Sequence, residues 1–197
     1  MGREKNSEYR NREHLTADEV AALLDAARLT GREKQSDRNY TLVLLMFRHG
    51  LRVVEAAGLE WKDIDLKAKT VYIKRAKGSE SGTHSLQADE VEALARLERV
   101  AGVKQVFVNE RGRSFLVESV DAVTAPGISR LIERLGQRAG LDIKVHAHMM
   151  RHSCGYYLAN QGYDLRLIQD WLGHRNIQHT IRYTKLAADR FKTIQWG

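Results

Sequence analysis

Residues 146–162 read HAHMMRHSCGYYLANQG and place three histidines around Arg151 within seven positions. The small and apolar residues that follow are typical of a helix, on which His148 and His152 would share one face. A zinc site is one interpretation of this pair, but the guanidinium between the two histidines would repel a dication. The planar guanidinium instead matches two phosphate oxygens, and histidine can exchange a proton near neutral pH. The stretch therefore favours an anion site. The plain alternative is that His148 and His152 are core residues whose ring nitrogens are hydrogen-bonded.

The chain has the length and composition of one globular domain. It holds 197 residues, of which 43% are hydrophobic and 29% charged. A single cysteine, Cys154, excludes an intramolecular disulfide and fits a reducing cytoplasm. No apolar run approaches the roughly 20 residues of a membrane span, and the polar N-terminus lacks a signal sequence. The net charge of +7 is compatible with a nucleic-acid partner, although basic and acidic residues are interspersed.

Helical patterns dominate the chain. In chain order they are predicted at 16–28, 38–50, 51–61, 88–100, 127–140, 149–162, 164–173 and 176–184. Thr16 and Glu19 form a capping-box pattern at the start of the first helix. Residues 70–73 and 83–86 flank a Gly/Ser turn at 78–82 and predict a β-hairpin, and QVFVN (105–109) predicts a further strand. The expected fold is mainly α with a small antiparallel β-sheet (α+β), with a flexible leader at 1–14 and one domain at 15–197.

Other segments place further reactive side chains at defined positions. HGLRVVE (49–55) carries Arg52 and, one helical turn later, Glu55, which is spaced to orient the guanidinium. The hairpin turn offers Lys77 in RAKGSE, WLGHRN supplies His174, and HTIRYT supplies Tyr183 nine positions later. Together these side chains suit chemistry at a phosphodiester, which needs both positive charge and proton transfer.

The order of these motifs resembles the catalytic domain of the tyrosine recombinases, the phage-integrase-like family. That family has an Arg in a TGLRxxE motif, a Lys in a β-hairpin, a His-x-x-Arg motif followed by His, an LGH motif and a Tyr shortly beyond. The resemblance covers roughly residues 14–193. More narrowly, HMMRHSCGYYLANQG (148–162) and RLIQDWLGHRNIQHT (166–180) are similar to the short recombinases that invert fimbrial promoter switches. The resemblance implies a tyrosine recombinase catalytic-domain fold without a separate N-terminal DNA-binding domain.

The resemblance also implies a role for each motif. Tyr183 would cleave DNA and form a 3′-phosphotyrosine, which leaves a free 5′-hydroxyl. Arg52 and Arg151 would hold the two non-bridging oxygens and stabilise the charge of the transition state. His148 would assist proton transfer at the tyrosine, whose ordinary pKa is about 10, and His174 would hydrogen-bond a non-bridging oxygen. No metal or other cofactor is implied, because two guanidinium groups supply positive charge and the covalent link preserves the bond energy for religation.

The general acid that protonates the leaving 5′-oxygen is expected to be Lys77. The family has a second basic residue soon after the glycine of the hairpin, whereas this chain continues as KGSESGTH (77–84), so Lys74 is the alternative. Supporting roles are implied for Glu55 and for His152, with core packing as an equal alternative for His152. DNA contacts and a solvated surface are both open interpretations of five basic residues: Lys74, Arg166, Arg175, Arg182 and Lys185.

The implied function is site-specific DNA recombination that inverts a promoter segment, of the fimbrial phase-variation type. Integration or excision of a mobile element, a catalytically silent DNA-binding regulator and a relaxing enzyme of the type IB topoisomerase kind are the alternatives. The implied partners are double-stranded DNA with inverted half-sites and further copies of the chain in a homo-tetramer on synapsed DNA, with DNA-bending accessory proteins as a further class. No membrane partner is expected, and the expected location is the cytoplasm, at the nucleoid.

Overall fold

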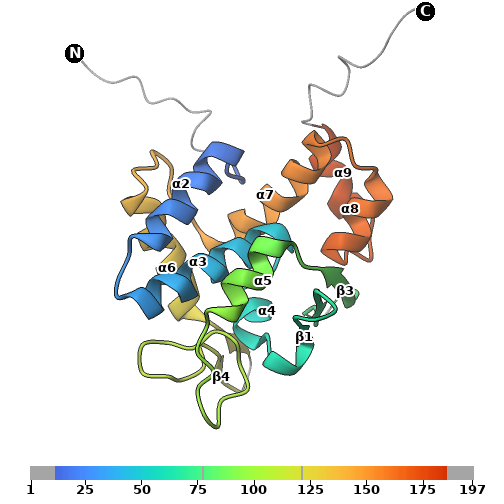
Figure 1. Cartoon of the computed structure of the whole chain (residues 1–197). Coiled ribbons are helices and arrows are strands. Elements are labelled where there is room, and N and C mark those ends of the chain that lie inside the picture. The colour runs from blue at the N-terminus through green and yellow to red at the C-terminus, as the bar shows by residue number, and fades with distance from the viewer. Residues whose placement is uncertain (1–11, 77, 121, 186–197) are drawn as a thin grey trace, which may run out of the picture.

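Helices predominate over strands among the described residues, and the strands form two small antiparallel sheets (Figure 1). The computed structural model describes residues 12–76, 78–120 and 122–185, so most of the predicted leader lies outside the described ranges. The helices are α2 (Ala17–Arg28), α3 (Glu33–Arg48), α4 (Val53–Gly58), the 3-10 helix η1 (Trp61–Asp63), α5 (Ala88–Ala95), α6 (Pro126–Arg138), α7 (Ala147–Asn160), α8 (Leu165–Leu172) and α9 (Gln178–Lys185). The predicted fold class, mainly α with a small antiparallel sheet, is confirmed.

The larger sheet contains the predicted hairpin. Its central strand β2 (Thr70–Ile73) pairs antiparallel with β1 (Ile64–Asp65) on one side and with β3 (Gly82–Ser85) on the other. Val71 and Ile73 are buried and point to the core, as expected for every second residue of a half-buried strand. A second hairpin, β4 (Val117–Glu118) with β5 (Val123–Thr124), was not predicted, because strands of two residues are too short to show a pattern.

The predicted starts of the first two helices differ in accuracy, because capping residues and apolar periodicity detect different parts of a helix. At α2 the predicted capping box is present, since Thr16 Oγ1 accepts from the backbone N–H of Glu19 at 3.2 Å and Glu19 Oε2 accepts from that of Thr16 at 2.8 Å. α3 begins earlier than predicted, at Glu33, and its first turns are polar and only partly buried. Apolar periodicity reveals only the buried part of a helix.

Residues 105–109 do not form the predicted strand. Gln105 makes one isolated backbone pairing with Glu60, and Val108 makes another with Ser114. Between them, Phe107 is fully buried in the main core. The prediction was wrong because an irregular segment that sends apolar side chains into a core has the same local pattern as a short strand.

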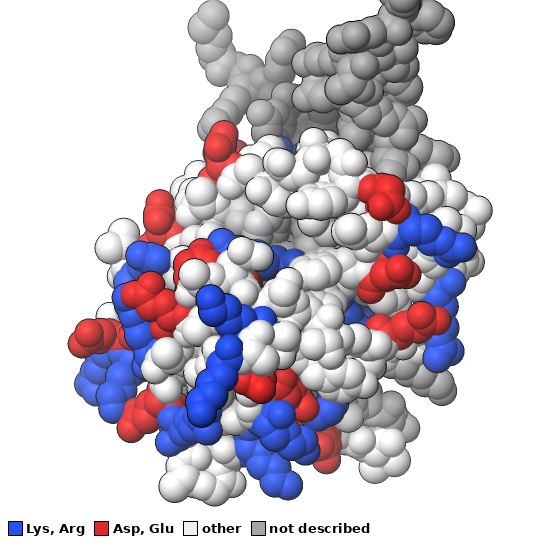
Figure 2. Space-filling model, turned by 45° about the vertical axis from the view of Figure 1, so that its right-hand side comes forward, with Lys and Arg blue, Asp and Glu red and all other residues white. Residues whose placement is uncertain are grey.

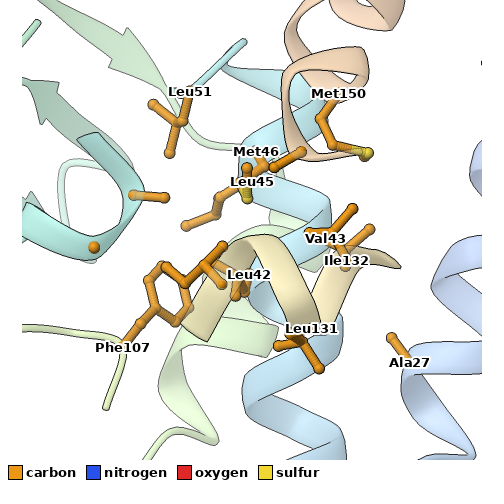
Figure 3. Packing of buried hydrophobic residues seen from close by; sticks show 14 of the residues in the cluster. Ala27, Leu42, Val43, Leu45, Met46, Leu51, Phe107, Leu131, Ile132 and Met150 are labelled. Carbon is orange, nitrogen blue, oxygen red and sulfur yellow. The ribbon is translucent and has the colours of Figure 1, made fainter. Parts of the chain in front are cut away.

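The main core surrounds α3 and fixes the elements that carry the site. Figure 3 shows Leu42, Leu45 and Met46 of α3 among Ile132 of α6 and Met150 of α7, all of them buried. Such close-packed contacts leave little freedom for the helix ends. The joint between α3 and α4 and the first turns of α7 are therefore held by one rigid core.

A smaller core lies between α7, α8 and α9, at the end of the molecule away from α2 and α6 (Figure 1). Cys154, Ile168, Leu172 and Tyr183 are among its buried members. α8 starts at the Asp164 side chain, which accepts two backbone N–H groups, and ends at a glycine in the left-handed conformation. No helix within the described ranges is long and apolar enough to cross a membrane.

Candidate active site

Arg52 and Glu55 lie together at the start of α4. Arg52 immediately precedes the helix, and its backbone N–H donates to Glu55 Oε2 across 3.0 Å. Its Nη1 donates to Glu55 Oε1 across 2.7 Å. The Glu55 side chain is 2% exposed and the Arg52 side chain 29% exposed. The carboxylate therefore orients a guanidinium that an anion can still reach from outside.

A second guanidinium, that of Arg75, contacts the same carboxylate. Arg75 Nη1 donates to Glu55 Oε2 across 2.9 Å, and the backbone N–H of Ala76 donates to Oε1 across 3.0 Å. Burial opposes the ionisation of Glu55, but the charge of Arg75 and the hydrogen bonds from Ala76 and Arg52 outweigh it and hold the pKa of Glu55 at about 2. Glu55 is therefore a carboxylate throughout the neutral range.

Arg151 lies on α7 inside the molecule, with 2% of its surface exposed. Its Nη1 donates to the carbonyl oxygen of Gly50 across 2.7 Å, and its Nη2 donates to that of Leu172 across 2.6 Å. Burial, followed by the nearby charges of Arg52 and Arg75, lowers the pKa of Arg151 to about 10. The group stays protonated near neutral pH, so three guanidinium charges share one region.

Tyr183 is part of the small core and is 1% exposed. Its hydroxyl lies 3.1 Å from His152 Nδ1, and its ring packs edge-on against Tyr156 with centroids 5.1 Å apart. Burial raises the pKa of the Tyr183 phenol to about 12. The hydroxyl therefore keeps its proton near neutral pH and needs a base before it can act as a nucleophile.

The two histidines of the α7 motif differ in exposure. His148 is exposed and His152 is buried, and their rings meet edge to face with centroids 4.5 Å apart. Partial desolvation lowers the pKa of His148, and burial lowers that of His152 to about 3, so His152 is neutral near pH 7. The contact with the Tyr183 hydroxyl is made by His152, on whose ring His148 packs. Among the described residues, no group of three or more His, Cys, Asp or Glu side chains is placed to hold a metal ion.

His174 follows α8 and lies beside the tyrosine. Its ring is nearly parallel to that of Tyr183, with an interplanar angle of 12° and centroids 6.3 Å apart. His174 Nδ1 lies 2.9 Å from Thr180 Oγ1, which fixes the orientation of the ring. Burial and then the charge of Arg151 lower the pKa of His174 to about 3. A neutral His174 has one ring N–H to offer to a phosphate oxygen.

The β2–β3 hairpin contacts the joint that carries His174. The backbone N–H of Glu80 donates to the carbonyl oxygen of Gly173 across 2.9 Å, and Ser79 pairs with His174. Gly173 has a φ of 67°, and a Cβ atom there would come within 2.3 Å of the Glu80 carbonyl oxygen. Glycine is therefore required for this close approach. Lys77 lies outside the described residues, so its role stays a prediction.

The five basic residues predicted as DNA contacts have different surroundings. Lys74 and Arg182 are exposed, and each is paired with an acidic side chain. Arg166 and Arg175 are exposed, and Lys185 lies in α9 with its side chain outside the described part. Figure 2 shows basic side chains interspersed with acidic ones on the face that it presents. Among the described residues, that face therefore carries no continuous basic patch.

Arg75 is a site residue that sequence reasoning missed. It stands in IKRAKG (73–78), where it reads as one more exposed cation of a hairpin turn. The alternation of β2 contains the signal, because residues 71 and 73 are buried and residue 75 continues the same inward-facing series. The side chain of Arg75 is indeed 1% exposed.

Comparisons with known proteins agree with this geometry. A model of the phage integrase family matches residues 13–190. The type 1 fimbriae regulatory protein FimB of Escherichia coli strain K12 is 42% identical over 194 residues, which cover 95% of this chain and 92% of FimB. FimE of the same strain is 39% identical over 189 residues, which cover 91% of this chain and 89% of FimE.

Solved structures show the same fold. The crystal structure of XerA recombinase has a TM-score of 0.76 and 27% identity, covering 93% of this chain and 66% of XerA. XerH site-specific recombinase, in a post-cleavage complex with a palindromic difH substrate, has a TM-score of 0.73 and 27% identity, covering 91% of this chain and 51% of XerH. This chain thus spans about two thirds of the XerA chain and half of the XerH chain. Because the family model and the FimB relative each cover nearly all of its length, the chain belongs to the phage integrase family, that of the tyrosine recombinases.

Proposed function

We propose that this chain cleaves and rejoins double-stranded DNA at specific sites through a 3′-phosphotyrosine intermediate, and that it inverts a promoter segment. The observation that carries the proposal is the position of the Tyr183 hydroxyl, 3.1 Å from a neutral histidine on the helix that also bears Arg151. The similarity to FimB and FimE, named as regulators of type 1 fimbriae, supports the inversion of a promoter as the outcome. On this proposal the protein acts in the cytoplasm, on nucleoid DNA.

The proposed cleavage is a transesterification. The phenolic oxygen of Tyr183 attacks the phosphorus, the bond from phosphorus to the 5′-oxygen breaks, and a phosphotyrosine bond replaces it. The phenolic proton leaves to a histidine, either His152 directly or His148 after the tyrosine has moved, and the 5′-oxygen takes a proton from Lys77. The reverse reaction starts when a 5′-hydroxyl attacks the phosphotyrosine. One phosphoester bond is exchanged for another, so the balance needs no nucleotide.

The charges around α4 and α7 suit the transition state of this reaction. Arg52 and Arg75 pair with the carboxylate of Glu55, and the charge of Arg151 lies in the same region, which leaves an excess of positive charge where the phosphate would bind. Arg52 is the most accessible of the three, with 29% of its side chain exposed. Guanidinium groups held in place before the reaction stabilise the charge that develops on the non-bridging oxygens. Removal of one such donor typically costs about a hundredfold or more in rate.

A nicked suicide substrate tests the proposal, because the fragment beyond the nick diffuses away and traps the covalent adduct. The wild-type chain is expected to form an adduct that survives a denaturing gel, whereas Tyr183→Phe forms none and still shifts the same DNA in a native gel. Binding persists because phosphate contacts supply most of the affinity. A wild-type chain that binds DNA without an adduct would instead be a silent DNA-binding regulator.

The products on plasmids distinguish the remaining candidates. Two sites in opposite orientation are expected to yield an inverted segment, and this outcome should need a tetramer that joins the two sites. Excision from sites in direct orientation, without inversion, would favour the enzyme of a mobile element. Relaxation of a plasmid without any site would favour a topoisomerase-like activity. Accessory DNA-bending proteins are added last, to ask whether they change the yield.

A further inference from the structure

Arg75 connects three segments of the chain: its own segment after β2, the α3–α4 joint with the start of α4, and the end of α8. Its Nη2 donates to the carbonyl oxygens of His49 at 2.9 Å and of Trp171 at 2.6 Å. Its Nη1 donates to the carbonyl oxygen of Gly50 at 3.2 Å and to Glu55 Oε2 at 2.9 Å. Its side chain is 1% exposed, so these acceptors rather than water surround it.

Each of the three segments carries a residue of the proposed chemistry. The joint between α3 and α4, whose two carbonyl groups Arg75 binds, leads directly into Arg52. The C-terminal end of α8, where Arg75 binds the Trp171 carbonyl, leads into His174. Arg75 itself follows β2, two positions before Lys77. We propose that Arg75 is a positioning residue, which holds these three segments in the relative placement that DNA cleavage requires; this inference rests on the proposed function.

A hydrogen bond joins the two sides of the hairpin turn just after β2. The backbone N–H of Arg75 donates to Ser81 Oγ across 3.0 Å and so ties the two sides of the turn together. On the side of α8, a Cβ atom at position 173 would come within 3.1 Å of Arg75 Cγ. Gly173 therefore lets the Arg75 side chain pass close to the end of α8 and reach the α3–α4 joint.

Arginine is the side chain that these acceptors need. A planar guanidinium directs several N–H groups along fixed directions, whereas the lysine ammonium is a single point charge on a flexible stem. A lysine at position 75 would leave some of the buried carbonyl groups without a donor, which is costly inside a protein. The charge at this position would be kept in such a variant, but the placement of the segments would not.

Arg75 also keeps Glu55 ionised. The groups that face Glu55 are Arg52 at the start of α4 and Arg75 beside the hairpin, with Arg151 of α7 and His174 after α8 in the same region. The charge of Arg75 is the largest effect that opposes the influence of burial on Glu55. Without it, the pKa of Glu55 rises. A protonated Glu55 loses its charge-assisted hydrogen bond to Arg52. The variant should then lose cleavage as the pH falls, in a range where wild-type Glu55 stays ionised.

The test compares Arg75→Lys and Arg75→Gln with the wild-type chain. Arg38→Gln is the matched control, because Arg38 is a partly buried residue whose guanidinium likewise donates to a backbone carbonyl, that of Val108 at 3.0 Å. Each protein is assayed for its unfolding midpoint, for binding to one half-site and for single-turnover adduct formation between pH 5 and pH 8. Binding to one half-site distinguishes two kinds of defect. A loss of phosphate contacts weakens binding, whereas misplaced segments slow cleavage and leave binding nearly unchanged.

Both Arg75 variants are expected to fold, to bind a half-site nearly as well as the wild type and to form adduct about a hundredfold more slowly, since a misplacement of about 1 Å can cost that much. The defect of Arg75→Gln relative to wild type should grow towards pH 5, and Arg38→Gln should cleave normally. Wild-type rates in either folded Arg75 variant, or a loss confined to binding, would overturn the inference. So would failure of both variants to fold, because Arg75 would then be a general stability residue. If the wild type forms no adduct at all, the proposed function fails and this inference with it.

Discussion

Arg151 donates from Nη1 to the carbonyl oxygen of Gly50 across 2.7 Å, although the two residues are 101 positions apart in the chain. This contact joins α7, with its two histidines, to the segment that leads into Arg52. Arg75 donates to the same carbonyl oxygen at 3.2 Å. One backbone carbonyl thus connects the buried guanidinium groups of the candidate site.

Arg151→Met should lower the stability of the fold as well as abolish cleavage. The methionine fills much of the volume but leaves the carbonyl group of Leu172 without this donor and that of Gly50 with Arg75 alone, at a cost of about 2–5 kcal/mol in the free energy of unfolding. Urea titration measures this loss. Arg96→Gln is the control, because the exposed pair of Arg96 with Glu92 should contribute under about 0.5 kcal/mol. Equal stabilities for the two variants would contradict the structural role of Arg151.

Gly155→Ala should disturb the tyrosine through a single methyl group. A Cβ atom at position 155 would lie 2.7 Å from the ring of Tyr183, which must then shift within a packed core. We expect a loss of about 1–3 kcal/mol in the free energy of unfolding and slower adduct formation. Gly58→Ala in α4 is the matched control, because the nearest atom to its Cβ would be 3.9 Å away and alanine favours a helix. Normal cleavage by Gly155→Ala would show that the ring position is not critical.

Stability should fall as the pH drops from about 6.5 towards 3. Burial lowers the pKa of His84, His152 and His174 to about 3, so the unfolded chain binds protons from pH 6.5 downward that the folded chain excludes. The histidines therefore penalise folding below pH 6.5 and not above it. Each proton that only the unfolded chain binds costs about 1.4 kcal/mol per pH unit. Glu55 adds a separate loss below pH 4.5, its ordinary pKa, because its folded pKa is about 2.

Urea midpoints at pH 7, 6 and 5 measure this dependence before the carboxylates contribute. His84→Gln should give a shallower slope over this range, because one of the three histidines named above no longer contributes. His84 lies in the hairpin strand β3 and stacks on Trp171, with centroids 3.9 Å apart, so the variant leaves Tyr183 and its partner histidine intact. An unchanged slope in His84→Gln would mean that His84 is not kept neutral by the fold.

Lys77→Ala should slow cleavage of a normal 5′-oxygen link much more than cleavage of a 5′-thio link. A thiolate leaves without a proton, so the general acid becomes unnecessary. Lys74→Ala is compared in the same assay, because Lys74 is the alternative acid and pairs with Asp63 at 2.8 Å. If the thio substrate rescues Lys74→Ala and not Lys77→Ala, the general acid is Lys74.

The sequence predicted most of the helices and the hairpin because their patterns are local. Thr16 with Glu19, and the buried alternation of Val71 and Ile73, depend on neighbours within a few positions. The segment around Phe107 was misread because its burial comes from distant elements. Local pattern and tertiary burial can agree or conflict, and only the first is visible in one sequence.

The candidate site was predictable in its residue types but not in its contacts. Motif order placed Arg52, Arg151 and Tyr183 in one site, and the structure brings them into one region. The partners of Arg151 are backbone carbonyl groups, and no side-chain pattern marks a carbonyl as an acceptor. The contacts of Arg75 escaped prediction for the same reason, since three of its four acceptors are carbonyl oxygens.

The end of α8 supplies negative charge to the candidate site without any ionisable group. The aligned peptide dipoles of a helix place roughly half a negative charge at its C-terminus. Arg75 and Arg151 bind the carbonyl oxygens of Trp171 and Leu172, which are the last two residues of α8. Peptide groups do not titrate, so this part of the counter-charge is the same at every pH. The two buried guanidinium groups are thus already hydrogen-bonded to the end of α8 in the absence of DNA. An incoming phosphate has to share them with these carbonyl groups.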